Sequence, residues 1–312
     1  MDLETGRHET GREYVWHGVT WAIGKPTLLL ANTATGLLDQ TEVMGLELGL
    51  RVSNPARFCT GRYGFAETFH IEPVPCPWQA EAGNGGQCPK CLEQDEFRFA
   101  HQFHKGGHAP PALAAYMSQP HWLYVATFAH GASKVGTAAA PRRTSRLDEQ
   151  GAMLATYLAE ASDGRAVRYL EDTISREIGV SQVVRGAAKL VALADPDPSR
   201  VQAAHERVVK SVVTVLATLG ISSGREEWSP PAEGLALRSP QLHGYRAVYP
   251  HDLREGEHGF HIESCAGTQI LVRLTAGTEA VRYVLDLNAL KGRRIVLGDF
   301  QSPETTFQAT LF

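Results

Sequence analysis

His121-Trp-Leu-Tyr-Val-Ala-Thr-Phe128 is the segment from which the rest of the architecture can be worked out. β-Branched and aromatic residues dominate it, a composition that is typical of a strand. A His130-Gly131 turn follows, and Ser133 to Thr137 forms a second short run of the same kind. Two such runs joined by a turn predict a β-hairpin.

Beyond this hairpin the pattern becomes helical. From Arg142 onward apolar residues recur at helical spacing, which predicts one helix that ends at the Asp163-Gly164 turn. Val167 to Leu170 then indicates a third short strand, and Glu171 to Ile178 a helix that begins at the glutamate. Strands that alternate with helices predict a small mixed α+β core.

β-Rich regions flank this core on both sides. Short apolar runs between turn signals predict strands in residues 14–72, and residues 244–312 are β throughout. The later strands form either a separate unit or a sheet shared with the earlier ones. Residues 181–219 predict two helices, and Ser229-Pro230-Pro231 indicates the beginning of a linker. We therefore divide the chain into a β-rich region (1–54), a cysteine- and histidine-rich segment (55–120), the core with its helical extension (121–222) and a C-terminal β-rich domain (240–312).

Composition limits the class of protein. Hydrophobic residues make up 43% of the 312 residues and charged residues 21%, as in ordinary soluble globular proteins. A net charge of −4 argues against a protein that coats nucleic acid, although it allows a local basic patch. The chain has no run of about 18 apolar residues, so no membrane span is expected. Because Met1 to Arg12 is polar and lacks the features of a targeting peptide, we expect a cytoplasmic protein.

Five cysteines in such a protein indicate metal ligands or buried thiols instead of disulfides. Cys88-Pro-Lys-Cys91 is a knuckle that directs two thiolates toward one ion, and Cys59 and Cys76 can complete a tetrahedron. We therefore predict a closed structural Zn²⁺ site. A zinc set that includes a histidine, a redox Cys-x-x-Cys pair and ordinary buried thiols are the alternatives. Cys265 stands alone and is expected in the core.

Three histidines follow the cysteine segment. His101, His104 and His108 would share one face of a helix and could bind a second metal ion there. Gly106-Gly107 weakens that helix, so we interpret the three side chains as polar surface histidines.

Five residues around the hairpin form an ordered set that suits phosphodiester cleavage: Tyr124, Lys134, Arg146, Gln150 and Glu171. A phenol can act as base or hydrogen-bond donor, and an arginine can neutralise charge that grows on phosphate. A carboxylate can hold Mg²⁺ or another divalent ion that activates water. Arg142, Arg143 and the glycine at Gly136 complete a candidate substrate-binding surface, since no acidic residue lies between positions 134 and 146.

These residues resemble the GIY-YIG nuclease superfamily. A tyrosine lies on the first hairpin strand, Val135-Gly136 follows about ten residues later, an arginine opens the next helix, and a glutamate lies on the helix after it. The chain also resembles a bacterial family of domains of unknown function, family 2797. In that family a cysteine-rich segment precedes Lys-Val-Gly and a helix start similar to Arg146-Leu-Asp-Glu-Gln-Gly-Ala152. The likeness covers roughly residues 55–190, and it implies a divalent-metal-dependent nuclease core that acts on DNA or RNA.

Three positions depart from the nuclease pattern. Lys134 stands where a second tyrosine is usual, Gln150 where a histidine is common, and Arg146 lies two residues later than usual after the glycine. A lysine can replace the tyrosine as base if burial or neighbouring cations lower its pKa. Two other functions therefore stay open: a catalytically degenerate, nucleic-acid-binding zinc protein, and an enzyme that uses this pocket for a small anionic metabolite.

Overall fold

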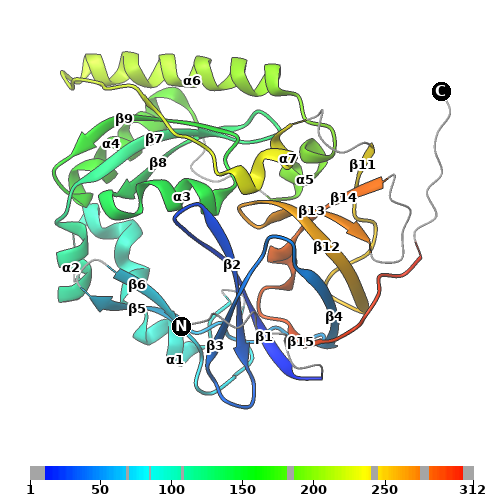
Figure 1. Ribbon diagram of the computed structural model, residues 1–312. Coiled ribbons are helices and arrows are strands. Elements are labelled where there is room, and N and C mark those ends of the chain that lie inside the picture. The colour runs from blue at the N-terminus through cyan, green and yellow to red at the C-terminus, as the bar shows by residue number, and fades with distance from the viewer. Residues whose placement is uncertain are drawn as a thin grey trace, which may run out of the picture.

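Strands from both ends of the chain form one large sheet (Figure 1). The computed structural model describes residues 11–67, 70–83, 86–106, 109–180, 186–239, 245–274 and 281–304. Within these residues nine strands pair in the order β11-β14-β13-β12-β4-β15-β1-β2-β3. They are β1 (Glu13–Ala22), β2 (Lys25–Asn32), β3 (Leu38–Glu42), β4 (Glu47–Asn54), β11 (Tyr245–Val248), β12 (Glu257–Ala266), β13 (Gln269–Leu274), β14 (Val281–Asp286) and β15 (Arg294–Leu297).

The two flanking β-rich regions therefore form one sheet. Of the two arrangements that the sequence leaves open, the shared sheet is the one observed, and the later strands do not form a separate unit. β15 lies between β1 and β4 and pairs antiparallel with both, so that Tyr14 stands opposite Ile295. Alternate residues of the strands in this sheet are buried on one face, among them Trp16 of β1 and Phe260 of β12, which are fully buried. Alternation of this kind is what the pleat of a half-buried sheet requires.

A second sheet of four strands, in the order β10-β9-β7-β8, lies at the centre of the chain. Its strands are β7 (His121–Thr127), β8 (Ser133–Ala139), β9 (Leu154–Ala161) and β10 (Glu226–Glu227). The expected hairpin is confirmed as β7 and β8, in which Tyr124 pairs with Gly136. The fold is α+β, as the sequence predicts.

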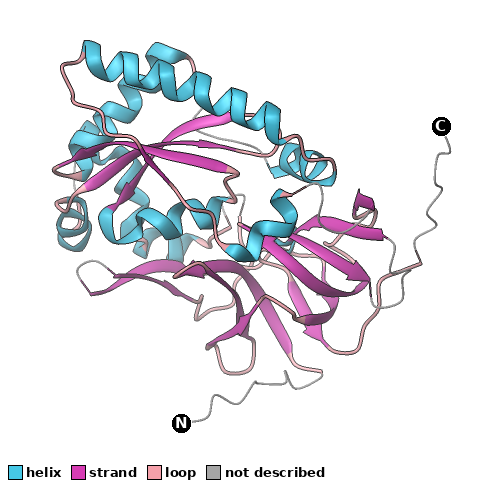
Figure 2. Ribbon diagram, turned by 45° about the horizontal axis from the view of Figure 1, so that its top comes forward, coloured by secondary structure: helices cyan, strands magenta, loops and turns pink. Residues whose placement is uncertain are grey.

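Helices cover both faces of this smaller sheet (Figure 2). One face of β7, with Tyr124 and Ala126, packs with Leu147 of α3 (Arg143–Gln150), which follows the short η2 (Ala140–Arg142). The other face, with Leu123 and Val125, packs on α4 (Gly164–Ile178) and α6 (Pro198–Thr218). α5 (Gly186–Ala194) connects this part to the large sheet, where Leu193 packs with Val284.

The chain after Gln150 differs from the sequence prediction. The helix ends there because Gly151 adopts the left-handed conformation at φ 63°, and the following residues form β9 instead of more helix. Pairing of β9 along the whole length of β7 overrides the weak helical pattern. Val167 to Leu170 is not a strand but part of α4, which begins at the capping side chain of Asp163. Glu171 consequently lies in the middle of a helix, where it is buried.

Ser229 and Pro230 are exposed, whereas the residues on either side of them are anchored to the two sheets. β10 pairs with β9, and buried Trp228 donates a hydrogen bond from Nε1 to Oδ1 of Asp148 at 3.2 Å. η3 (Ala232–Gly234) and α7 (Leu235–Arg238) then lie against β12. In the described part of the chain no helix is both long and apolar enough to cross a membrane.

The cysteine segment contains a small hairpin and short helices. β5 (Arg62–Glu67) and β6 (His70–Val74) pair antiparallel, and α1 (Pro89–Gln94), η1 (Glu96–Lys105), α2 (Pro111–Met117) follow; η4 (Leu287–Leu290) is the remaining short helix. Aromatic contacts join these elements. The ring centroid of Phe97 on η1 lies 6.3 Å from that of Phe65 on β5 and 5.9 Å from that of Tyr116 on α2.

Candidate metal centre and candidate active site

Cys59, Cys76, Cys88 and Cys91 form a buried cluster. Their sulfur atoms all lie within 4.8 Å of one another. The Sγ atoms of Cys76 and Cys88 are 3.9 Å apart, close to the edge of about 3.8 Å that a tetrahedral site with Zn–S bonds of about 2.3 Å has. No side chain of the four is more than 5% exposed. The cluster is thus consistent with a structural Zn²⁺ site.

Local backbone geometry prepares the cluster for thiolates. The amides of Gly61 and Cys88 donate hydrogen bonds to Sγ of Cys59 at 3.3 and 3.1 Å. Gly61 has φ +77°, and a Cβ there would lie 1.9 Å from the carbonyl oxygen of Val74, so only glycine fits. Burial raises the pKa of Cys91 above its usual range, and a bound cation would offset this effect.

Of the three histidines that follow the cysteine segment, only His104 has its side chain within the described residues. Nε2 of His104 bonds Oδ2 of Asp172 on α4 at 2.7 Å, which joins η1 to the core. The side chain of His101 and the whole of His108 lie outside the described residues.

The second site is built around Tyr124, which comes from the central strand of the smaller sheet. Nε2 of Gln150 donates a hydrogen bond to the Tyr124 hydroxyl at 2.8 Å and another to the carbonyl oxygen of Arg146 at 2.8 Å. The phenol ring lies over Gly136, where an added Cβ would stand 2.6 Å from it. The glycine of the Val-Gly motif is therefore needed to admit the ring.

Lys134 lies on the same face of the hairpin as Tyr124, opposite Ala126 and two residue pairs away from the Tyr124–Gly136 pair. Burial, followed by the charges of Arg146 and Lys189, lowers the pKa of Lys134 to about 7, while Glu171 acts in the opposite direction. Burial raises the pKa of Tyr124, and the nearby charge of Arg146 opposes this effect. The charges of Arg146 and Glu171 therefore act on both the tyrosine and the lysine.

Glu171 enters from α4 and is 6% exposed. Its Oε2 accepts a hydrogen bond from Nη1 of Arg168 at 2.7 Å. The four cysteines are the one group of three or more His, Cys, Asp or Glu side chains clustered closely enough to hold an ion among the described residues. A divalent ion at the second site would therefore depend on one carboxylate, which it would share with Arg168, and on water and substrate phosphate.

Arg142 and Arg143 are engaged by carboxylates. Nη2 of Arg142 lies 2.5 Å from Oε1 of Glu149, and Nη2 of Arg143 lies 2.5 Å from Oε1 of Glu226. The guanidinium of Arg143 also stacks over Trp122 at 4.3 Å. By contrast, the Arg146 side chain is 41% exposed, and its Nη1 atom lies 3.9 Å from Oε2 of the same Glu149.

Sequence reasoning missed two cations of this site. Arg168 precedes Glu171 by three residues, and that helical spacing could have indicated the ion pair had the helix been placed correctly. Lys189 donates from Nζ to the carbonyl oxygen of Gln150 at 2.8 Å and lies over Phe128. Its contribution depends on how α5 packs, and the sequence alone carries no signal for that.

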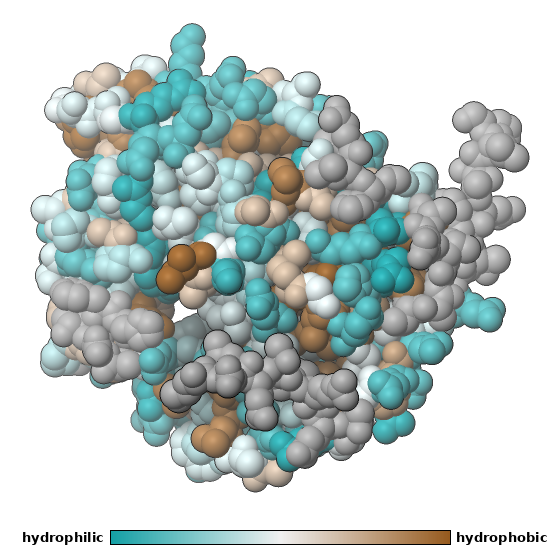
Figure 3. Space-filling view, viewed as in Figure 1, coloured by the Kyte–Doolittle hydropathy of each residue, from teal (hydrophilic) through white to brown (hydrophobic). Residues whose placement is uncertain are grey.

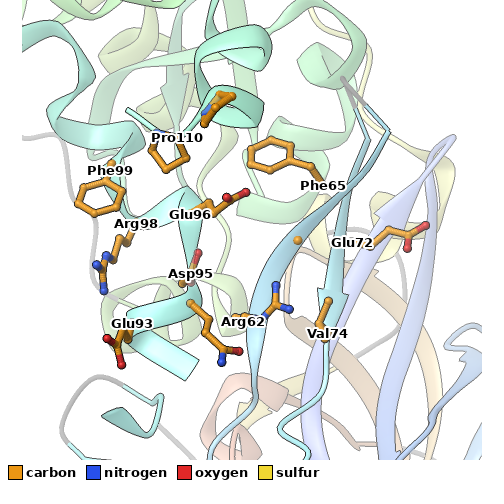
Figure 4. Close-up of a pocket in the computed structure, with 13 residues that line it drawn as sticks. Arg62, Phe65, Glu72, Val74, Glu93, Asp95, Glu96, Arg98, Phe99 and Pro110 are labelled. Atoms are coloured by element: carbon orange, nitrogen blue, oxygen red, sulfur yellow. The ribbon is translucent and has the colours of Figure 1, made fainter. Parts of the chain in front are cut away.

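A cleft lies in the cysteine segment, and none of its lining residues belongs to the Tyr124 site. It measures about 770 Å³ between the β5–β6 hairpin and η1, and Glu96 and Phe65 face each other across it (Figure 4). The face of the molecule in Figure 3 is mostly hydrophilic, with scattered apolar side chains. Such scatter is normal for a protein surface.

No protein-family model matches the chain, and neither a curated protein nor a solved structure is significantly similar to it. The resemblance to the GIY-YIG superfamily accordingly rests on the residues quoted above.

Proposed function

We propose that the protein is a GIY-YIG-like phosphodiester hydrolase that acts on DNA or RNA and carries structural zinc at its four cysteines. One observation supports the proposal most: burial and the charge of Arg146 lower the pKa of Lys134 to about 7, on the hairpin face that also carries Tyr124 and its hydrogen bond from Gln150. A general base works best when its pKa lies near the working pH. The departure of Lys134 from the nuclease pattern is thus compatible with catalysis.

In this proposal Nζ of Lys134 accepts a proton from water as the water oxygen bonds to phosphorus. The bond from phosphorus to the leaving oxygen breaks, and the Arg146 guanidinium stabilises the negative charge on the phosphate oxygens. Gln150 holds the Tyr124 hydroxyl, which donates a hydrogen bond to the substrate. A divalent ion held by Glu171 would act as a Lewis acid when bound.

A second candidate function is the binding of nucleic acid without cleavage. The ion pair between Arg168 and Glu171 favours it, because an arginine competes with a divalent cation for the same carboxylate. The site then presents Lys134, Arg146 and Arg168 to a phosphate group.

Cleavage of labelled single-stranded DNA, duplex DNA and RNA with added Mg²⁺ or Mn²⁺ tests the two functions. We expect products from the wild type and none from Glu171→Gln, with unchanged zinc content. Lys134→Met should also abolish cleavage, whereas Lys210→Met, at an exposed lysine of α6, should not. Binding of nucleic acid without any cleavage supports the second candidate, and the absence of both overturns the two proposals.

A further inference from the structure

Lys189 on α5 joins the two elements that carry Tyr124 and Gln150. Its Nζ atom donates a hydrogen bond to the carbonyl oxygen of Gln150, the last residue of α3, at 2.8 Å. The same atom lies over the ring of Phe128, 4.1 Å from the ring centroid. Phe128 directly follows β7, the strand of Tyr124, and is 1% exposed. One ammonium group therefore contacts both the end of the helix and the end of the strand.

α3 is a helix whose C-terminal end needs a positive charge. It has only eight residues, and a helix of that length depends on tertiary contacts. The carbonyl groups of its last turn lack partners within the helix and form the negative end of the helix dipole. Asp148 and Glu149 add acidic groups at this end, and the last turn contains no basic residue. Lys189 supplies both the missing charge and a hydrogen-bond donor from outside the helix.

The side chain of Gln150 depends on where this end of the helix lies. Its Nε2 atom donates to the Tyr124 hydroxyl and to the carbonyl oxygen of Arg146, each at 2.8 Å. Because Lys189 holds the backbone of the same glutamine, a shift of the helix end would move the amide away from the phenol. Arg146 lies one turn earlier on α3 and would move with it.

The large sheet fixes the position of Lys189. Leu193, one turn further along α5, is buried and packs in one cluster with Val284 of β14 and Leu271 of β13. Burial also lowers the pKa of Lys189 to about 8, so the ammonium is the main form at pH 7, where its contact with an aromatic ring is strengthened by the loss of water. The ammonium group is thus a fixed link from the large sheet to the Tyr124 site.

We propose that Lys189 is a positioning residue of the Tyr124 site: by holding the end of α3 against the end of β7, it keeps Gln150 and Arg146 in place beside Tyr124. This inference rests on the proposed function, because it takes these three residues as the reacting site. It gives the large sheet a part in the reaction, since that sheet sets where α5 and its lysine stand.

The test measures kcat and KM for cleavage of the labelled single-stranded DNA, duplex DNA or RNA with added Mg²⁺ or Mn²⁺. Lys189→Met should lower kcat by roughly 10- to 100-fold and change KM by less than about twofold, because a displaced group slows the reaction more than it weakens binding. Lys189→Arg keeps a cation at the helix end and should restore most of the rate. Adding Lys189→Met to Gln150→Leu should cause less than about a twofold further loss, because both changes act through the same hydrogen bond.

A second measurement needs no substrate. The amides of Gly151 and Ala152 donate to the carbonyl oxygens of Asp148 and Leu147, so their hydrogen exchange reports on the end of α3. Exchange at these amides should be faster in Lys189→Met than in the wild type. Lys291→Met is the matched control, because Lys291 is another partly buried lysine but follows η4 in the large sheet.

Each result decides between the proposals. Wild-type protein that cleaves none of the three nucleic acids overturns the proposed function and this inference with it. Wild-type cleavage overturns this inference alone if Lys189→Met is as fast, if the losses multiply in the double variant, or if Lys291→Met is slowed equally. Lys189→Gln, which removes the charge but stays polar, takes the place of Lys189→Met if that variant does not fold.

Discussion

The cysteine cluster consists of groups that can become negative, whereas most charged groups of the Tyr124 site are positive. The cluster gathers four thiols that become negative when they lose their protons. The Tyr124 site gathers Lys134, Arg146 and Arg168, with Glu171 bonded to Arg168 and Glu149 3.9 Å from Arg146. Each arrangement is incomplete without a partner of the other sign, which is a cation for the first and an anion for the second.

The two sites differ in how open they are to that partner. No cysteine is more than 5% exposed, so an ion in the cluster would be enclosed and held through folding. The Arg146 side chain is 41% exposed, so an anion there can enter and leave. A buried set of like groups thus suits a structural role, and a partly open set suits turnover or reversible binding.

The largest effect is expected from removing one thiolate of the enclosed site. Cys91→Ser should reduce bound zinc from about one equivalent to below half and loosen residues 55–110, because structural zinc binding contributes on the order of 10 kcal/mol to folding. Elemental analysis and hydrogen exchange measure the two effects. Cys265→Ser is the control, since that buried thiol lies outside the cluster. Full zinc retention in Cys91→Ser would contradict the assignment.

The next effect is expected at the open site. Arg146→Ala should slow cleavage by about 2–4 kcal/mol of transition-state stabilisation, roughly 30- to 1,000-fold, and leave zinc content unchanged. Single-turnover rates measure it, with Arg176→Ala as a control at an exposed arginine of α4. Equal losses in the two variants would show that general positive charge, and not the position of Arg146, matters.

A smaller, pH-dependent effect should separate the two sites further. With a pKa of about 7 in place of 10.5, folded Lys134 binds fewer protons than the unfolded chain between these values, so its contribution to stability rises with pH across that window. As a base it should make the cleavage rate rise with pH and level off above about 7. Lys134→Met should remove the rise in stability and abolish cleavage. A wild-type rate independent of pH between about 5 and 9 would argue against the lysine as base.

The smallest effect is expected from Arg142→Ala and Arg143→Ala. If three to four contacts with phosphate are made, log affinity should fall with log salt at a slope of about −3. The carboxylates of Glu149 and Glu226 already engage these two arginines, so each replacement should change the slope by less than Arg146→Ala does. Salt titration of oligonucleotide binding measures the three slopes, and a larger change for Arg142 or Arg143 would move the phosphate path toward them.

Structural features that are set by neighbouring residues could be predicted from the sequence, and features that depend on distant partners could not. The β7–β8 hairpin follows from residue types within about fifteen positions, and the cysteine cluster from one knuckle and two further thiols. Residues 154–161 form a strand because they pair with β7, and a helical pattern in isolation cannot reveal that pairing. The burial of Trp228 just before the prolines likewise depends on a partner 80 positions away, Asp148, which local composition cannot indicate. The engagement of Glu171 by Arg168 followed from a helix that begins seven residues earlier than the pattern indicated.

The position of β15 has a consequence for how the chain is made. These four residues separate β1 from β4 in the sheet, and Arg294 at their start bonds Glu13 across 281 positions. During synthesis the first strands leave the ribosome long before this partner exists. β1 then has only β2 beside it, and its other edge stays open to wrong partners. The large sheet can therefore close only after residues 294–297 have been synthesised, whereas the hairpin of the smaller sheet is available for pairing much earlier.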